Sequence, residues 1–195
     1  IDLYFHGRFD ESREIIYNAF FNYNNPRHVL LKYTKVHSGT QFFRIRSNET
    51  YDLYSPIEMF HIPFEKRSLT TNQRYSISGY PCLYLGSSAY GCWEELKRPD
   101  VEMCNIVALE NAQWLTIMDL SLSSISPSNF IEEDLYNISL RLICSLKVYD
   151  KVSPFKPEYI IPQALLGCMI RRNDKSDPYY CDGIKYTSSF YDTKR

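Results

Sequence analysis

The sequence lacks the basic excess that is typical of proteins that bind nucleic acid. Its 195 residues hold 22 lysines and arginines against 23 aspartates and glutamates, a formal net charge of −1. Because general nucleic-acid binding depends on neutralising phosphates, no nucleic-acid partner is expected. No apolar run approaches the roughly 20 residues that a transmembrane helix needs, so no membrane partner is expected either.

The chain has neither a secretory signal peptide nor an initiator methionine, because it begins at Ile1. We therefore expect a fragment or a processed product, with a further domain upstream. Cys-x-x-Cys pairs are also absent, and neither the cysteines nor the four histidines have metal-ligand spacing, so no metal site is expected. Several cysteines lie in apolar segments, which is typical of reduced thiols and indicates the cytoplasm. The six cysteines are Cys82, Cys92, Cys104, Cys144, Cys168 and Cys181.

The common catalytic and phosphate-binding motifs are missing as well. There is no Walker motif and no Gly-x-Gly-x-x-Gly. The run from Gly86 to Gly91 lacks the Gly-x-Ser-x-Gly spacing of a nucleophile elbow. The last histidine of the chain is His61, so a triad in the order serine, acid, histidine is excluded for this run.

The sequence does have many tyrosines, seventeen in all. A tyrosine joins a large apolar ring to a polar tip, which suits a pocket for a flat polar ligand and equally an amphipathic core edge. The length and the ordinary apolar content predict one folded domain with a short extension. We place an N-terminal helical extension or connector at 1–38 and the main domain at 39–195.

Hydrophobic periodicity predicts an α+β fold. Helices are expected over 11–23, over 131–148 and from Pro162 to Arg171–Arg172. Strands are expected over 41–46, 81–85, 103–109, 113–120 and 183–189, with a hairpin or tight turn at 110–112, while 27–36 fits helix or strand. The apolar stripe of the second helix is Ile131, Leu135, Ile138, Leu142 and Leu146. This loose alternation favours mixed or antiparallel sheets with flanking helices.

The stretch from Arg74 to Glu95 concentrates more polar chemistry than a structural strand-turn-helix needs. Its helix is expected to begin at an N-cap formed by Ser87 or Ser88. Residues 47–80, which include the start of this stretch, form a long irregular segment, and such segments are more often functional than decorative.

Four separated pieces of the sequence together resemble the RES-domain family, which is named for an arginine, a glutamate and a serine. They are Phe43-Arg44-Ile45-Arg46, then Gln73-Arg74-Tyr75-Ser76 with Gly79-Tyr80-Pro81-Cys82-Leu83-Tyr84, then Glu95 with Glu94 as a close competitor, and Tyr186-Thr187-Ser188 with Ser189 as the alternative serine. The resemblance covers residues 40–190, and it departs from the family pattern at Gln73 and Ser76.

The resemblance implies an ADP-ribosyltransferase-like fold and an enzyme that consumes NAD+ as its substrate, without a separate cofactor. It also implies a toxin that is held inactive by an antitoxin partner. The catalytic residues would be Glu95, Arg44 and Ser188, and the substrate-binding residues Arg74, Tyr75, Tyr84 and Arg46.

The chemistry of these residues is compatible with cleavage of the nicotinamide–ribose bond. A carboxylate such as Glu95 stabilises an oxocarbenium-like transition state, and arginines such as Arg44 and Arg74 bind a pyrophosphate. The alternatives are transfer of ADP-ribose to a macromolecule and a catalytically inactive binding module. Hydrolysis and phosphorolysis both fit, and Glu95 also fits an ordinary helix residue paired with Arg98.

Overall fold

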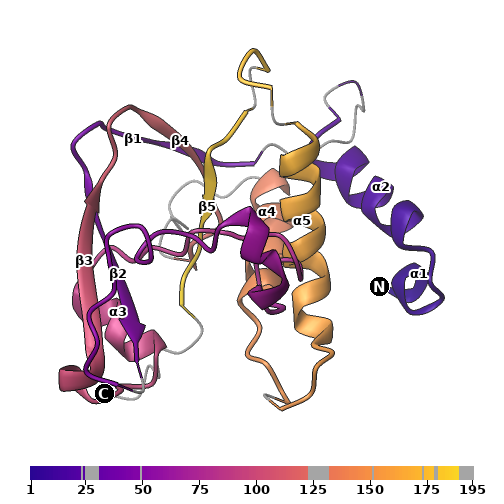
Figure 1. Cartoon of the computed structure of the whole chain (residues 1–195). Coiled ribbons are helices and arrows are strands. Elements are labelled where there is room, and N and C mark those ends of the chain that lie inside the picture. Colours follow the sequence, from indigo (N-terminus) through magenta and orange to yellow (C-terminus); the bar gives the residue numbers. More distant parts are fainter. Residues whose placement is uncertain are drawn as a thin grey trace. The chain divides into compact units, whose positions relative to one another are not determined.

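The chain folds into two units in the computed structural model shown in Figure 1. Unit 1 holds Ile1–Lys35 and Thr116–Thr187, and unit 2 holds Val36–Leu115 and Ser188–Arg195. The structure describes residues 1–22, 24, 31–48, 50–122, 132–150, 152–172, 174–177 and 180–188. The domain boundary predicted after residue 38 stays a prediction.

Unit 1 combines helices with a three-stranded sheet. Its helices are α1 (Asp2–Phe5), α2 (Phe9–Phe20), α4 (Glu132–Ser145), the 3-10 helix η5 (Pro157–Tyr159) and α5 (Ile160–Arg171). Its strands are β1 (Tyr33–Val36), β4 (Leu115–Asp119) and β5 (Gly183–Lys185), in the order β1-β4-β5, with β4 and β5 parallel. Helix α5 contacts both α2 and α4, and Figure 1 shows α4 and α5 side by side.

Unit 2 is built around an antiparallel pair of strands. The pair is β2 (Gln41–Ser47) with β3 (Cys104–Glu110), and the register runs from Gln41 opposite Glu110 to Ser47 opposite Cys104. The unit also contains η1 (Phe64–Leu69), α3 (Ala89–Glu95) and η2 (Val101–Met103). Helices with mixed and antiparallel sheets confirm the predicted α+β class.

Most of the predicted elements are present, with shifted ends. Helix α2 lies where 11–23 was predicted, and the helix predicted from Pro162 begins two residues earlier because proline needs no backbone donor in the first helical turn. The end of the ambiguous segment 27–36 is strand β1, whereas residues 25–30 lie outside the described part of the chain. The last strand, β5, stops at Lys185 rather than at 189.

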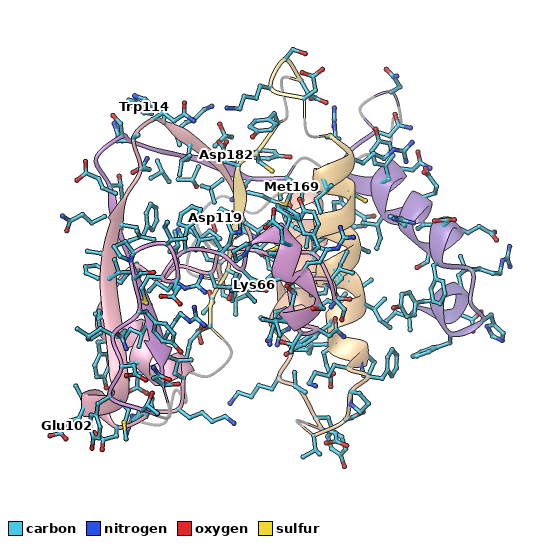
Figure 2. All side chains as sticks on the ribbon, in the orientation of Figure 1. Lys66, Glu102, Trp114, Asp119, Met169 and Asp182 are labelled. Carbon is cyan, nitrogen blue, oxygen red and sulfur yellow. The ribbon has the colours of Figure 1, made fainter. Side chains whose placement is uncertain are left out.

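Of the hairpin and the tight turn that were the predicted alternatives at 110–112, the hairpin is wrong. Strand β3 pairs with β2, whereas β4 belongs to the three-stranded sheet, so the turn between them connects two sheets. Sequence adjacency favoured the hairpin, but longer-range pairing partners were available to both strands. Beside the turn, Asn111 donates to the carbonyls of His37 and Gln113 at 2.9 and 2.8 Å. The ring of Trp114 contacts that of His37 in a tilted arrangement, with 3.9 Å between ring centroids. Figure 2 labels Trp114 at this end of the strands.

The apolar stripe predicted for α4 is also wrong. Leu135, Leu142 and Leu146 are 53%, 51% and 51% exposed, and Ile131 lies outside the described residues. The buried face instead carries Asn137, Leu140, Arg141 and Cys144. The helical period was therefore correct but its phase was not, because two polar residues face inward.

The burial of the polar face of α4 is explained by a buried polar cluster at the end of β4. Arg141 is 2% exposed and donates to the carbonyl of Ser121 at 2.9 Å and to that of Asp119 at 3.0 Å. The Asp119 carboxylate, labelled in Figure 2, accepts hydrogen bonds from Ser121, from Thr34 at 3.3 Å and from Lys185 at 3.2 Å. A buried arginine that saturates backbone carbonyls stabilises this end of the sheet.

We expect Arg141→Ala to lower the free energy of unfolding by about 3 kcal/mol, because it removes two buried hydrogen bonds and opens a cavity. The neighbouring Leu142→Ala is the matched control and should cost less than about 1 kcal/mol, since that side chain is half exposed. Urea denaturation of both variants measures the difference. A larger loss for Leu142→Ala would show that the predicted apolar stripe faces the core after all.

A second expectation concerns acid stability. Burial opposes ionisation of Asp119, but the hydrogen bonds from Ser121 and Lys185 outweigh it and lower the pKa of this carboxyl. Its ionised form therefore stabilises the fold above the ordinary aspartate pKa of about 3.9, and this contribution is lost as the pH falls through the lowered value. Asp119→Asn should be less stable at pH 7 and should lose less stability between about pH 4 and pH 2. Denaturation at a series of pH values tests this, and an unchanged acid slope would contradict it.

Candidate active site

Strand β2 carries two arginines on one face. Residues alternate across a strand, so Arg44 and Arg46 point to one side while Ile45, 8% exposed, points to the other. The Nη1 atom of Arg44 is buried and has no hydrogen-bond partner among the described residues. Burial lowers the pKa of Arg44, and the positive charge of Arg46 lowers it further. The buried Nη1 atom of Arg44 can donate a hydrogen bond, and an anionic ligand would supply the acceptor that it lacks.

Arg46 is already engaged by the loop that follows β2. Its guanidinium lies 4.3 Å from the ring centroid of Tyr54 and donates to the carbonyl of Glu58. A stacked arginine of this kind is held in one orientation. The substrate-binding role predicted for Arg46 stays a prediction, and the structure shows it fixing the loop beside Arg44.

The strand predicted over 81–85 does not form. The residue next to this segment, Gly86, forms a single bridge to β2, through two hydrogen bonds of 2.8 Å with the backbone of Phe43. Pro81 has no amide to donate to a ladder, and the hydroxyl of Tyr84 accepts from the amide of Tyr75 at 3.1 Å. Side-chain bonding across the loop therefore replaces regular pairing with β2.

The segment that contains Arg74 is a tight, buried turn. Arg74, Tyr75 and Ser76 are 8%, 4% and 1% exposed. Gln73 and Ser76 exchange backbone hydrogen bonds of 3.0 and 3.2 Å, and the Ser76 hydroxyl donates to the carbonyl of Tyr80 at 3.0 Å. Tyr84 attaches this turn to the strand edge at Gly86, so Arg74 and Tyr75 are held at a fixed position relative to β2.

Helix α3 begins at the predicted cap and packs against β2. Ser88 is the N-cap residue, and its hydroxyl accepts from the amide of Gly91 at 3.0 Å. One turn further, the Cys92 thiol donates to the carbonyl of Phe43 at 3.2 Å. A Cβ atom at Gly86 would lie 2.4 Å from the Cys92 sulfur, so only glycine permits this approach.

The charges of both Arg44 and Glu95 affect the pKa of the Cys92 thiol. Burial raises the pKa of Cys92, the backbone of Gly86 lowers it, the carboxylate of Glu95 raises it, and the guanidinium of Arg44 lowers it. The structure thus brings Arg44 from β2 and Glu95 from α3 into the surroundings of one side chain. Sequence analysis did not predict that Cys92 would lie near Arg44 and Glu95. The feature of the sequence that could have indicated its packing against β2 is the glycine six residues before it, Gly86.

The two adjacent glutamates have different surroundings. Glu94 forms a bidentate ion pair with Arg98, with hydrogen bonds of 2.9 and 3.0 Å. Glu95 makes no hydrogen bond or ion pair with the residues that the structure describes. The alternative in which Arg98 pairs with Glu95 is therefore not the arrangement seen. The carboxylate that is available to a ligand is that of Glu95.

The structure does not join Ser188 to this group of residues. Ser188 is half-buried and begins the second stretch of unit 2, while Ser189 lies outside the described residues. The preceding residue, Thr187, accepts from the amide of Leu122 within unit 1. The role of Ser188 stays a prediction, whereas Arg44, Arg74, Tyr75, Tyr84 and Glu95 all lie in unit 2.

Other reactive groups are poor candidates for catalysis. All six cysteines are free thiols, and burial raises the pKa of Cys168 to about 11 and that of Cys181 to about 12, so both are protonated at neutral pH. Within the described part of the chain, no group of three or more histidine, cysteine, aspartate or glutamate side chains could hold a metal ion. No helix in that part is both long and apolar enough to span a membrane.

Comparison with known proteins finds a toxin-like relative. The chain is 39% identical over 166 residues to the Bacillus subtilis (strain 168) protein named "Putative toxin YopC". The match includes 76% of this chain and 36% of the relative, so the chain spans little more than a third of that protein. No family model matches the chain. No solved structure matches it either.

We expect Gly86→Ala to destabilise unit 2 by about 1–3 kcal/mol, because the added methyl group collides with the Cys92 sulfur and pushes α3 from β2. Cys92→Ala removes the colliding atom. The double variant should therefore lose less stability than the sum of the single variants, by about 0.5 kcal/mol or more. Denaturation of the four proteins gives the coupling, and strictly additive losses would show that the two residues are not in contact.

Proposed function

We propose that this chain is an NAD+-consuming toxin of the RES type, with an ADP-ribosyltransferase-like fold. It would cleave the glycosidic bond between nicotinamide and ribose. The observation that carries the proposal is that Arg44, which has a buried guanidinium nitrogen without a partner, and Glu95, which has no ion-pair partner among the described residues, both act electrostatically on Cys92. This pairing of an anion-binding group with a free acid suits a substrate that joins a pyrophosphate to a positively charged glycosidic linkage.

The acid has a defined part in this reaction. As the bond from C1′ of the ribose to the nicotinamide nitrogen breaks, its electron pair goes to that nitrogen and neutralises the pyridinium charge. Positive charge develops on the ribose, and the Glu95 carboxylate stabilises it by electrostatic attraction. Water, which releases a proton to the solvent, or a phosphate oxygen then forms the new bond to C1′, and the product is ADP-ribose or its phosphorylated counterpart.

The arginines hold the other end of the substrate. Arg44 has an unused donor, and a pyrophosphate oxygen would replace its missing partner. Arg74 lies on the turn attached through Tyr84 and supports the same contact. Tyr75 is 4% exposed, so we infer that it and Tyr84 shape the wall of the site rather than offer an open stacking surface. Ser188 would add a hydrogen bond to the bound substrate.

The toxin part of the proposal is supported by the similarity to the Bacillus subtilis relative, whose name describes a toxin. A protein that depletes NAD+ in the cytoplasm needs restraint in its own cell. We therefore propose an antitoxin, either a separate protein or a further domain, that covers the site. Residues 39–195 would form the catalytic domain.

The test is to produce the chain by cell-free synthesis, incubate it with NAD+ with and without phosphate, and separate the products by chromatography. We expect loss of NAD+ and release of nicotinamide. Free ADP-ribose would indicate hydrolysis, a phosphate-dependent product phosphorolysis, and label on a macromolecule transfer. Unchanged NAD+ under all these conditions would refute the enzymatic proposal and favour a binding module.

The matched variants are Glu95→Gln and Glu94→Gln. Glu95→Gln should fold normally and lose about 100-fold or more in kcat, because it removes the charge that stabilises the transition state. Glu94→Gln should lose much less, since that carboxylate is occupied by Arg98. A circular dichroism melt confirms folding of both. The reverse order of activities would assign the catalytic role to Glu94.

A further inference from the structure

Helix α4 has an apolar face that is exposed. Its buried residues recur every three or four positions, so they occupy one side of the helix, and α4 contacts α5 and η5. On the opposite side, five large apolar side chains are between 40% and 56% exposed. A solvent-facing helix surface usually carries polar and charged residues instead. The exposed apolar residues are Leu135, Tyr136, Leu142, Ile143 and Leu146.

These residues form one continuous stripe along α4. Leu135, Leu142 and Leu146 are separated by seven and four positions, so they lie one above another on the helix surface. Tyr136 and Ile143 are seven positions apart and form a second row beside the first. Single exposed apolar residues are normal, but a contiguous apolar surface marks an interaction site.

The middle of this stripe suits the close approach of a second helix. Ser139 lies there, is exposed, and has a small side chain. Two copies of α4 that cross at this point in opposite directions would place both Ser139 residues at a two-fold axis. Leu135 of each copy would then lie beside Leu142 of the other, and Tyr136 beside Ile143. Apolar side chains would therefore fill the contact on both sides of the axis.

The charges along α4 favour two antiparallel copies. The helix begins with the acidic sequence Glu132-Glu133-Asp134, and Lys147 follows its last turn. In an antiparallel pair, the acidic start of each helix lies near Lys147 of the other copy, and the two helix dipoles are opposed. A parallel pair would bring the two acidic starts together, which like-charge repulsion disfavours. The two ends of this helix are thus complementary to a second copy in the reverse direction.

We propose that α4 is the contact helix of a homodimer, in which the apolar stripe of one copy packs antiparallel on the stripe of a second copy. The inference concerns unit 1 alone and does not rest on the proposed function. An interface made by one helix from each copy is small beside the about 1,200–2,000 Å² that specific interfaces bury. We therefore expect a dissociation constant in the micromolar range.

The experiment is sedimentation velocity of the full chain between about 1 and 200 µM, a range chosen to span a micromolar dissociation constant. The mass should rise with concentration from the 23.0 kDa of one chain towards twice that value. Leu142→Lys should weaken the association about tenfold or more, because each dimer would bury two lysines in an apolar contact. A single chain at every concentration, or an unchanged dissociation constant in Leu142→Lys, would overturn the proposal.

The matched control is Ile15→Lys on α2, the same kind of change at another exposed apolar residue of unit 1. Ile15 is 60% exposed and lies outside the stripe. This variant should keep the dissociation constant within about twofold of the wild type, since the change is to an exposed side chain away from the contact. Circular dichroism melts confirm that both variants fold. Equal weakening by the two variants would show that the association does not depend on α4.

Cysteine cross-linking tests the direction of the two helices. In the antiparallel pair, Ser139→Cys brings two thiols together at the axis, within reach of a disulfide. The sulfurs of Leu146→Cys would lie about 20 Å apart along the pair, because each helical residue advances about 1.5 Å. On a non-reducing gel, with the wild type as the background for its six native cysteines, we expect a cross-linked dimer for Ser139→Cys alone. Any other pattern of cross-linking in these two variants would refute the antiparallel arrangement.

Discussion

The close approach of α3 to β2 is the contact on which the candidate site depends. The Cys92 thiol reaches the backbone of Phe43, and Gly86 leaves the space that the sulfur occupies. Because close-packed interiors tolerate little change in volume, one methyl group at Gly86 is enough to disturb this contact. Through it, an arginine from a strand and a glutamate from a helix come to the same place, although fifty residues separate them in the chain.

Arg141 and Arg44 show how differently a buried guanidinium nitrogen can be treated. Arg141 in unit 1 donates to two carbonyls at the end of a strand, so its burial stabilises the fold. Arg44 in unit 2 has a buried nitrogen without a partner, and burial lowers its pKa. An unsatisfied buried donor costs stability, and such groups are concentrated where a ligand completes them. The contrast is the physical reason for proposing a ligand-binding role for Arg44 and a structural role for Arg141.

Sequence patterns predicted elements well where the signal was local. Apolar periodicity located α2 and α5, and strand patterns located β2 and β3. The capping preference of serine limited the start of α3 to Ser87 or Ser88, and the structure has Ser88 as the cap. The patterns failed where distant groups competed. An apolar and aromatic run over 81–85 between turn residues indicated a strand, but the Tyr84 hydroxyl and a single bridge at Gly86 replaced the ladder. The stripe on α4 had the correct period and the wrong phase because Arg141 satisfies carbonyls that lie twenty residues away.

The sequence by itself determined the α+β class, the chemistry of the candidate residues and their order along the chain, because these depend on composition and local periodicity. Tertiary structure decided which residues meet. It distinguished Glu95 from Glu94 through the ion pair with Arg98, and it placed Arg44 beside Cys92. Two adjacent glutamates on one helix have nearly the same local sequence, so only the three-dimensional position of a cation can make one of them available and the other not.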